Sequence, residues 1–303
     1  MFNLEEHSVI RSGFFNPSIP NSFNPYIKMK DFKNKVIAIT GAGSGMGRAY
    51  AIEFGKLGAK LALADWNEAN LLETKQLVQD LGVTEVFTKA FDVSIETEVF
   101  QFAEDVKSAL GNTHIIINNA GIAGGGGPFI YGDAKAFQKV MEVNLFGVIY
   151  GCRAFLPQLV ENNEGAVVNV SSVASLIGAP GAIAYNTSKF AVRGFTETLM
   201  AEFHKSPISI HNVMPGKIKT AIADGLETDT YKKTLVTPPE VVVRDVIKGI
   251  KKGKSNILSG HLASSINFLS KLPLSLRIKI LWREQIGKMK LHDRFKPFNS
   301  LMK

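Results

Sequence analysis

The sequence predicts an α/β protein with a doubly wound, parallel, seven-stranded sheet and helices on both of its faces. Short, nearly continuous apolar segments recur between residues 35 and 259, which is typical of parallel strands that are buried on both sides. Between them lie longer segments with apolar residues at helical spacing. Strands that alternate with helices in this way form a parallel sheet covered by helices.

The expected elements follow in a regular order along the chain. We predict strands at 36–39, 61–64, 86–90, 115–117, 166–170, 208–213 and 256–258. We predict helices at 45–57, 67–81, 95–110, 136–160, 184–204 and 239–252, the fourth being one long helix or two in series. In a doubly wound sheet the ligand binds beyond the carboxyl ends of the strands, so the loops that follow the strands are where a site is expected.

The chain divides into three predicted parts. Residues 34–260 form one domain, residues 1–33 an irregular N-terminal arm, and residues 261–303 a basic, amphipathic, helical C-terminal extension. No segment has the roughly 18 uninterrupted apolar residues of a membrane-spanning helix. Residues 1–30 also lack the apolar run of a secretory signal. We therefore expect a cytoplasmic protein.

The net charge of +8 is concentrated near the C-terminus. From Arg244 onward, 14 Lys or Arg stand against three acids, a net charge of +11 that leaves −3 for the first 243 residues. The basic extension favours either a peripheral membrane contact or packing on the domain or on a second subunit. No nucleic-acid partner is expected, because the domain is slightly acidic and contains no recognition module.

Cysteine and histidine usage excludes two kinds of site. Cys152 is the single cysteine, so no internal disulfide can form, and its apolar surroundings favour a buried core residue over a nucleophile. The six histidines are scattered and none pairs with an acid or with Cys152 at ligand spacing. We predict no metal site.

A glycine-rich segment links the first strand to the first helix. Thr40–Gly47 reads T-G-A-G-S-G-M-G. Glycine lets the backbone approach a pyrophosphate, and a helix N-terminus offers N–H groups to an anion. A tight turn without a ligand is the alternative. The candidate cofactor contacts here are Gly41, Ser44, Gly45, Met46 and Gly47.

Asp65 closes the second strand, 18 residues after Gly47. An acid at this point would accept hydrogen bonds from the adenosine ribose and repel a 2′-phosphate. Trp66 follows, and no Arg or Lys stands close by in the sequence. These features favour NAD over NADP. The alternative is that Asp65 only caps the following helix.

Tyr185 and Lys189 are four residues apart, so a helix places them on one face. A neighbouring ammonium lowers the pKa of a tyrosine, which makes the pair a candidate acid/base near neutral pH. The alternative is a buried tyrosine and a surface lysine on an ordinary amphipathic helix.

Taken in order, these motifs resemble those of the short-chain dehydrogenase/reductase family, over about residues 34–260. The family's patterns are T-G-x-x-x-G-x-G, N-N-A-G, a catalytic Ser, Y-x-x-x-K and P-G. Their counterparts here are Thr40–Gly47, Asn118–Gly121, Ser172, Tyr185–Lys189 and Pro215–Gly216 with Thr220 four residues later, and Asn144 stands where the family has its fourth catalytic residue.

The resemblance implies a Rossmann fold, a homodimer or homotetramer, and specific residue roles. The implied catalytic residues are Asn144, Ser172, Tyr185 and Lys189. In such proteins Asn144 would hold a water that links Lys189 to solvent, and Lys189 would bond the nicotinamide ribose. The other implied cofactor contacts are Asp92 and Val93 at the adenine, Asn118, Ala120, Pro215 and Gly216, and Ile218 and Thr220 at the carboxamide.

The sequence thus predicts an NAD-dependent oxidoreductase for a secondary alcohol or ketone, with Tyr185 as general acid/base. The loop 217–236 carries Ile222, Leu226, Tyr231 and Leu235, which favours an apolar substrate. Two alternatives stay open. One is an NADP-preferring carbonyl reductase, disfavoured by Asp65. The other is a non-catalytic dinucleotide-binding sensor or scaffold, disfavoured because all four catalytic positions are filled.

Overall fold

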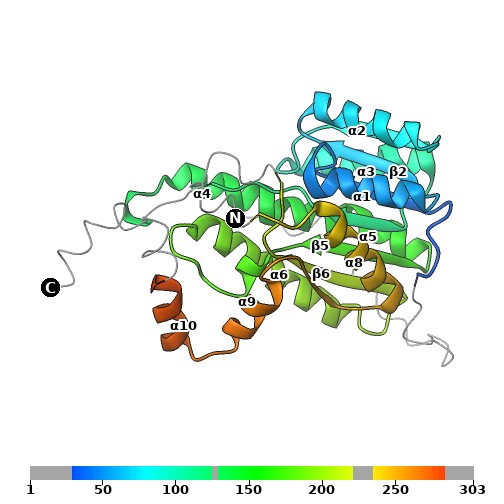
Figure 1. Ribbon diagram of the computed structural model, residues 1–303. Coiled ribbons are helices and arrows are strands. Elements are labelled where there is room, and N and C mark those ends of the chain that lie inside the picture. The colour runs from blue at the N-terminus through cyan, green and yellow to red at the C-terminus, as the bar shows by residue number, and fades with distance from the viewer. Residues whose placement is uncertain (1–28, 125–128, 221–234, 284–303) are drawn as a thin grey trace, which may run out of the picture.

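The computed structural model describes residues 29–124, 129–220 and 235–283. Its seven strands form one sheet in the order β3-β2-β1-β4-β5-β6-β7, and all neighbours are parallel. The predicted doubly wound fold is confirmed (Figure 1). The strands are β1 (Val36–Thr40), β2 (Lys60–Asp65), β3 (Val86–Ala90), β4 (Ile115–Asn118), β5 (Gly165–Val170), β6 (Ile208–Pro215) and β7 (Asn256–Ser259).

Helices cover both faces of the sheet (Figure 1). The α-helices are α1 (Gly45–Lys56), α2 (Glu68–Asp80), α3 (Glu96–Leu110), α4 (Ala134–Met141), α5 (Gly147–Glu161), α6 (Ile183–Glu202), α8 (Pro239–Lys252), α9 (Ala263–Ser270) and α10 (Leu274–Leu281). Three short helical segments complete them: η1 (Phe129–Tyr131) and η3 (Val173–Ser175), which are 3-10 helices, and η2 (Glu142–Phe146), which is a π-helix.

Alternation along each strand builds two apolar cores. In β1, Ile37 and Ile39 join the core beneath α1, α2 and α8, whereas Val36 and Ala38 join the core beneath α3, α5 and α6. All five residues of β1 are buried. Burial on both faces explains why a central strand such as β1 is apolar at nearly every position rather than at every second one.

The predicted helix over 136–160 is one continuous helical run with a change of winding. At η2 the Gly147 N–H bonds to the Glu142 carbonyl, five residues back. By length and composition the run Ala134–Glu161 could cross a membrane, but 56% of its most apolar window is buried inside the domain. It contacts α3 and α6. We therefore interpret it as a core helix.

The domain begins before residue 34. Met29 and Phe32 are buried in the core beneath α1, and the Phe32 ring meets the Phe54 ring edge-on at a centroid distance of 5.1 Å. The predicted arm therefore extends no further than residue 28, and those residues lie outside the described part. Two apolar residues three apart are too short a pattern to assign to a core from sequence.

The sheet order reverses between β1 and β4, and this junction is closely bonded. The Thr40 hydroxyl accepts the backbone N–H groups of Asn119 and Ala120, each at 3.1 Å. The Asn119 amide donates to the Thr40 carbonyl at 2.9 Å. In a doubly wound sheet the crevice for a ligand opens at this reversal.

Candidate active site

The glycine-rich segment makes a turn that only glycine permits. Gly41 and Gly45 have φ values of +68° and +52°, in the left-handed region. A Cβ at Gly47 would lie 1.8 Å from the Gly41 carbonyl oxygen. Ser44 caps α1 without a side-chain hydrogen bond, so the first N–H groups of the helix remain available to an anion.

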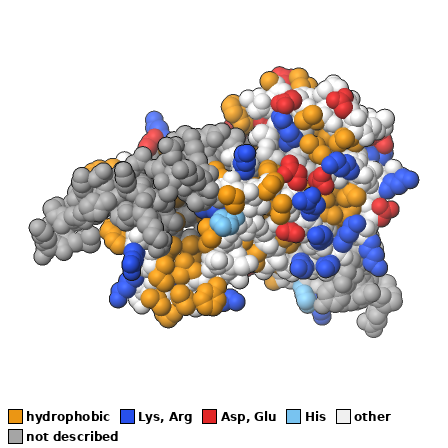
Figure 2. All heavy atoms as spheres, in the orientation of Figure 1, with side chains coloured by type: hydrophobic (Ala, Val, Ile, Leu, Met, Phe, Trp, Pro, Cys, Tyr) orange, Lys and Arg blue, Asp and Glu red, His pale blue; other side chains and the backbone are white. Residues whose placement is uncertain are grey.

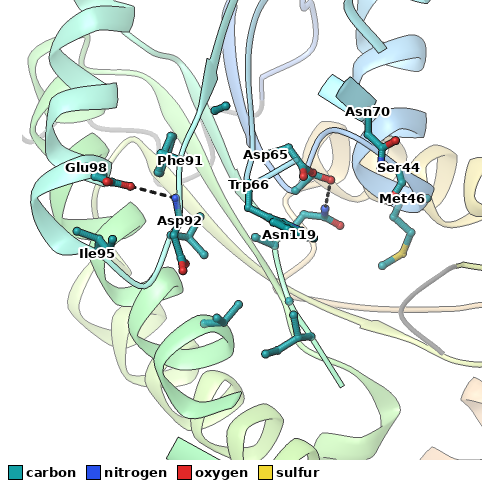
Figure 3. Close-up of a pocket in the computed structure, with 18 of the residues that line it drawn as sticks. Ser44, Met46, Asp65, Trp66, Asn70, Phe91, Asp92, Ile95, Glu98 and Asn119 are labelled. Atoms are coloured by element: carbon teal, nitrogen blue, oxygen red, sulfur yellow. Dashed lines mark hydrogen bonds between the residues drawn. The ribbon is translucent and has the colours of Figure 1, made fainter. Parts of the chain in front are cut away.

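Beside this turn is a pocket of about 790 Å³, shown in Figure 3. It runs along the ends of β1, β2 and β4 and reaches Thr220 beyond β6. The predicted cofactor residues that line it are Gly41, Ser44, Gly45, Met46, Asp65, Asp92, Val93, Ala120 and Thr220. The size and the glycine-lined wall suit an extended ligand that carries phosphates.

Asp65 is almost fully buried at the pocket wall, with both carboxylate oxygens engaged. Oδ2 accepts the Gly43 N–H at 2.8 Å, and Oδ1 accepts the Asn67 N–H at 2.9 Å. The cap of α2 is Asn67, whose side chain accepts the Asn70 N–H. The alternative that Asp65 is the helix cap is therefore wrong.

Arg48 is a residue beside the glycine-rich turn that sequence reasoning missed. Its Nη2 donates to the Gly43 carbonyl at 2.7 Å, on the residue whose N–H bonds Asp65. The expectation of no basic residue near Asp65 holds along the chain but fails in space. The guanidinium also forms a two-pronged pair with the Glu73 carboxylate, at 2.8 and 2.7 Å, and is therefore already paired.

Asp92 lies at the other end of the pocket with a second missed residue, Lys139. The carboxylate accepts the Lys139 ammonium at 2.8 Å and both the N–H and the hydroxyl of Ser94. Burial raises the pKa of Asp92, but these hydrogen bonds outweigh it and hold the pKa below its ordinary value. The Asp92 backbone N–H donates to Glu98, as the dashed line in Figure 3 shows.

Ser172 and Tyr185 meet where β5 ends and α6 begins. Their side chains are hydrogen-bonded to each other, and Ser172 also accepts the Ala174 N–H at 3.1 Å. Loss of solvation raises the pKa of Tyr185, and the bond to Ser172 offsets part of that rise. The pKa of Tyr185 is therefore shifted upward, opposite to the lowering predicted from the spacing to Lys189.

Lys189 is 3% exposed, one turn along α6 from Tyr185. Its ammonium donates to the Val170 carbonyl at 3.0 Å and lies 5.7 Å from the centre of the Tyr185 ring. Burial lowers the pKa of Lys189 to about 8. The alternative of a surface lysine is wrong, since a helix face that looks amphipathic in sequence is covered here by β5.

Asn144, in the π-helical turn, is fully buried, and both polar atoms of its side chain form hydrogen bonds. Its amide donates to the Ile122 carbonyl at 2.9 Å and to the Ser188 hydroxyl at 3.0 Å, and its Oδ1 accepts the Ile122 N–H at 2.7 Å. A Cβ on Gly121 would lie 3.2 Å from the Asn144 oxygen and 3.4 Å from the Lys189 nitrogen. Asn144, Lys189 and Tyr185 thus converge beside the pocket.

Comparison with known proteins settles the family. A family model described as "short chain dehydrogenase" matches residues 35–230. The chain belongs to the short-chain dehydrogenase family. Members bind a nicotinamide cofactor, and this short-chain dehydrogenase is an oxidoreductase that acts on CH–OH groups.

Individual relatives extend the match over most of the chain. The oxidoreductase SadH of Mycobacterium tuberculosis is 37% identical over 257 residues, which cover 80% of this chain and 92% of SadH. Epidermal retinol dehydrogenase 2 of Mus musculus is 34% identical over 269 residues, covering 88% and 86%. The crystal structure of a Burkholderia phymatum short-chain dehydrogenase/reductase in complex with NAD superposes with a TM-score of 0.73 at 29% identity, covering 83% and 96%.

Several residues that the family resemblance implied lie behind the pocket of this short-chain dehydrogenase rather than on its wall. Asn118 is buried, and its amide donates to Asn169 at 2.8 Å. Pro215 ends β6, and a Cβ on Gly216 would lie 2.1 Å from the His261 carbonyl. Ile218 is buried and pairs in an isolated bridge with Thr237. These residues form the support on which the pocket is built.

The other residues considered in the sequence are Cys152, possible metal ligands and the loop residues. Cys152 is buried, and burial raises the pKa of its thiol to about 12, which fits a core residue. Within residues 29–124, 129–220 and 235–283, no three His, Cys, Asp or Glu side chains lie together as metal ligands would. Ile222, Leu226, Tyr231 and Gly125–Gly127 lie outside the described residues.

Proposed function

We propose that the protein is an NAD-preferring dehydrogenase for apolar secondary alcohols and the matching ketones, with Tyr185 as general acid/base. The observation that carries this proposal is the buried ammonium of Lys189, which lies 5.7 Å from the centre of the Tyr185 ring, with Ser172 beside the same tyrosine. A titratable hydroxyl, an oxygen partner and a buried cation that converge beside a pocket form an acid/base site.

The pocket fits a dinucleotide on the basis of its own residues. Side chains at Gly41, Gly45 or Gly121 would meet Asn119, Thr220 or Asn144, so the wall stays open only with glycine at these points. The turn and the first N–H groups of α1 would hold the phosphates, with Asp65 and Asp92 at the adenosine end. When bound there, a nicotinamide cofactor supplies hydride transfer.

The chain's own residues would handle the proton. In oxidation Tyr185 accepts the proton of the substrate hydroxyl, and in reduction it returns that proton to the carbonyl oxygen. Ser172 positions the same oxygen by a hydrogen bond. Lys189 favours the ionised form of Tyr185 through its charge. Asn144 acts through its neighbours, holding the backbone at Ile122 and the hydroxyl of Ser188.

Preference for NAD is supported by the charges at the end of β2. Asp65 places a carboxylate at the pocket wall, where a 2′-phosphate would be repelled. Arg48 could balance such a phosphate only by leaving Glu73 and the Gly43 carbonyl. Trp66 is 78% exposed beside Asp65 and offers an aromatic surface without charge.

An apolar substrate is supported by the residues that follow Ser172. Val173, Leu176 and Ile177 directly follow Ser172 and are buried in an apolar cluster with residues of β6, α9 and α10. The name of the mouse relative, a retinol dehydrogenase, points to an apolar alcohol for that protein. A homodimer or homotetramer and a cytoplasmic location complete the proposal.

Cofactor choice is tested by titrating the purified protein with NADH and with NADPH. We expect tight NADH binding and weak NADPH binding. Asp65→Asn keeps one acceptor for the backbone but removes the charge. The ratio of NADH affinity to NADPH affinity should therefore fall by about tenfold, on the order of 1.4 kcal/mol. Equal affinities in the wild type would overturn the NAD preference.

Turnover is tested with long-chain secondary alcohols and NAD, against short polar alcohols. Tyr185→Phe should retain NADH affinity and lose turnover by roughly a hundredfold or more. If the wild type binds NADH but oxidises no alcohol and reduces no ketone, the sensor alternative replaces the enzyme. If short polar alcohols react as well as long apolar ones, the apolar preference is wrong.

A further inference from the structure

The last two described helices have an unusual surface. Helix α9 follows β7 and packs against the segment immediately after Ser172, and α10 joins the same apolar cluster through Leu281. Ala263 and Leu281 are their buried contacts, in one cluster with Leu176, Ile177 and Met214. This anchoring fixes how the two helices lie on the domain, and therefore which side chains face away from it.

The outward side of α9 and α10 is apolar as well. We call it the α9–α10 apolar face; it comprises Leu262, Phe268, Leu274 and Ile278. Phe268 is 70% exposed, Leu274 60% and Ile278 54%. Figure 2 shows this region as a patch of hydrophobic side chains with Lys and Arg at its margin.

The apolar stripe expected of an amphipathic helix is present on α10, but most of it is exposed. On α10, Leu274, Ile278 and Leu281 lie on one side of the helix, and of these only Leu281, at the C-terminal end, is buried. The apolar stripe of a helix is normally buried against a protein core or in lipid. Exposed apolar patches of this kind on a protein surface mark contact sites.

The charges around the face all have one sign. Residues 260–283 include Lys271, Arg277, Lys279 and Arg283 and no Asp or Glu. Among the described residues, no ion pair engages Lys271, Lys279 or Arg283. The partner of this face must therefore accept apolar side chains and also carry negative charge.

Charge decides between the occupants of the face. A second copy related by a twofold axis would bring the same four cations against each other. A nucleic acid would meet the cations but leave the aliphatic side chains without a partner. A bilayer with anionic headgroups offers both a hydrophobic layer and negative charge at the same depth.

We propose that the α9–α10 apolar face docks the protein on an anionic lipid bilayer, with Phe268, Leu274 and Ile278 inserted below the headgroups. Lys271 and Lys279 then lie at the level of the lipid phosphates. Because α9 and α10 pack on the segment after Ser172, docking brings the substrate side of the site to the lipid surface. That last consequence rests on the proposed function; the docking does not.

The test is flotation of the full-length protein with vesicles. Vesicles of phosphatidylcholine with roughly one third phosphatidylserine are compared with phosphatidylcholine alone, at low and high salt. We expect binding to the anionic vesicles that is weakened at least about tenfold by high salt or by omitting phosphatidylserine. Failure of the wild type to float with anionic vesicles overturns the proposal.

Two double variants locate the contact. Leu274→Ser with Ile278→Ser should weaken binding by about tenfold or more, and Lys271→Glu with Lys279→Glu should do the same. The matched controls are Leu72→Ser on α2, where Leu72 is 50% exposed, and Lys252→Glu on the exposed end of α8. Both controls should float like the wild type.

The same variants distinguish membrane docking from a subunit interface. If both double variants float like the wild type, the contact lies elsewhere and the proposal is wrong. If they leave flotation unchanged and dissociate an oligomer in light scattering, the face is a subunit interface. NADH affinity in solution is measured alongside, so that loss of docking with intact NADH binding separates this proposal from the proposed function.

Discussion

Asn144 binds both backbone polar groups of Ile122: its oxygen accepts the Ile122 N–H at 2.7 Å and its amide donates to the Ile122 carbonyl at 2.9 Å. The two residues are 22 positions apart, one in the π-helical turn η2 and the other in the segment after β4 that lines the pocket. One buried side chain therefore ties the wall of the pocket to the helix that supports it.

Replacing Asn144 should affect stability and activity together. Asn144→Ala leaves the Ile122 backbone groups without partners, which costs about 2–3 kcal/mol. Turnover should fall by roughly tenfold or more, because the displaced segment lines the site. Thermal unfolding and steady-state kinetics measure the two effects.

Gln158 provides the control for Asn144. It is also a buried amide, accepting the Thr113 N–H at 2.9 Å and donating to the Ala103 carbonyl at 3.0 Å. Gln158→Ala should lower the thermal midpoint by a similar amount and leave the activity of the folded protein unchanged. Equal losses of activity in both variants would mean that Asn144 has only a structural role.

Burial of Lys189 should make stability depend on pH in the alkaline range. Its pKa is about 8 in the folded protein, against about 10.4 in an unfolded chain. Below pH 8 the ammonium is charged in both states and the burial cost is fully present. Between these two pKa values the unfolded chain holds the proton that the folded protein has lost, so the free energy of unfolding rises with pH, by up to about 3 kcal/mol.

Lys189→Met removes this contribution while keeping an apolar side chain of similar length. Urea unfolding near pH 7 and near pH 10 is compared for the two proteins. As the pH rises, the free energy of unfolding of the wild type should increase relative to that of Lys189→Met. A difference that stays constant across this range would show that the ammonium is solvated.

Substitution by alanine should be harmful at Gly47 and stabilising at Gly194. At Gly47 a Cβ would lie 1.8 Å from the Gly41 carbonyl oxygen, so Gly47→Ala must distort the turn and should abolish NADH binding. Gly194 is exposed in the interior of α6, and a Cβ there meets nothing within 4 Å. Gly194→Ala should raise stability by about 0.5–1 kcal/mol and leave NADH binding unchanged.

Arg48 should matter for cofactor affinity more than for turnover. It holds the Gly43 carbonyl, while Asp65 holds the N–H of the same residue. Arg48→Met should weaken NADH binding about tenfold, measured by fluorescence titration, with little change in kcat. Lys107→Met, which breaks the exposed pair with Glu161, should not alter binding. An unchanged NADH affinity in Arg48→Met would leave Arg48 with the sole role of joining α1 to α2.

The elements of the sheet were predictable because the central strands are buried on both faces and the edge strands β3 and β7 still carry short apolar runs. Burial forces apolar residues at consecutive positions, and the intervening helices keep a regular spacing, so β1 to β7 could be assigned from local pattern alone. The position of Tyr185 and Lys189 on one helical face followed from the four-residue spacing. These features depend on residues close together in the chain.

What the sequence did not predict depends on contacts between distant segments. Arg48 and Lys139 reach Glu73 and Asp92 across 25 and 47 residues, and no local pattern marks such pairs. The pKa of Tyr185 is governed by burial, which the four-residue spacing to Lys189 does not reveal. Met29 and Phe32 were missed because two residues are too few to define a period.

The π-helical turn carries a consequence for changes of chain length. Its extra residue sets the rotational phase between α4 and α5, because each residue added to or removed from a helix turns everything beyond it by about 100°. A one-residue deletion inside Glu142–Phe146 would restore regular α-helical winding. It would also rotate either Asn144 away from Ile122 or the buried face of α5 away from the sheet. This stretch should therefore accept substitutions on its exposed side far more readily than insertions or deletions of any length.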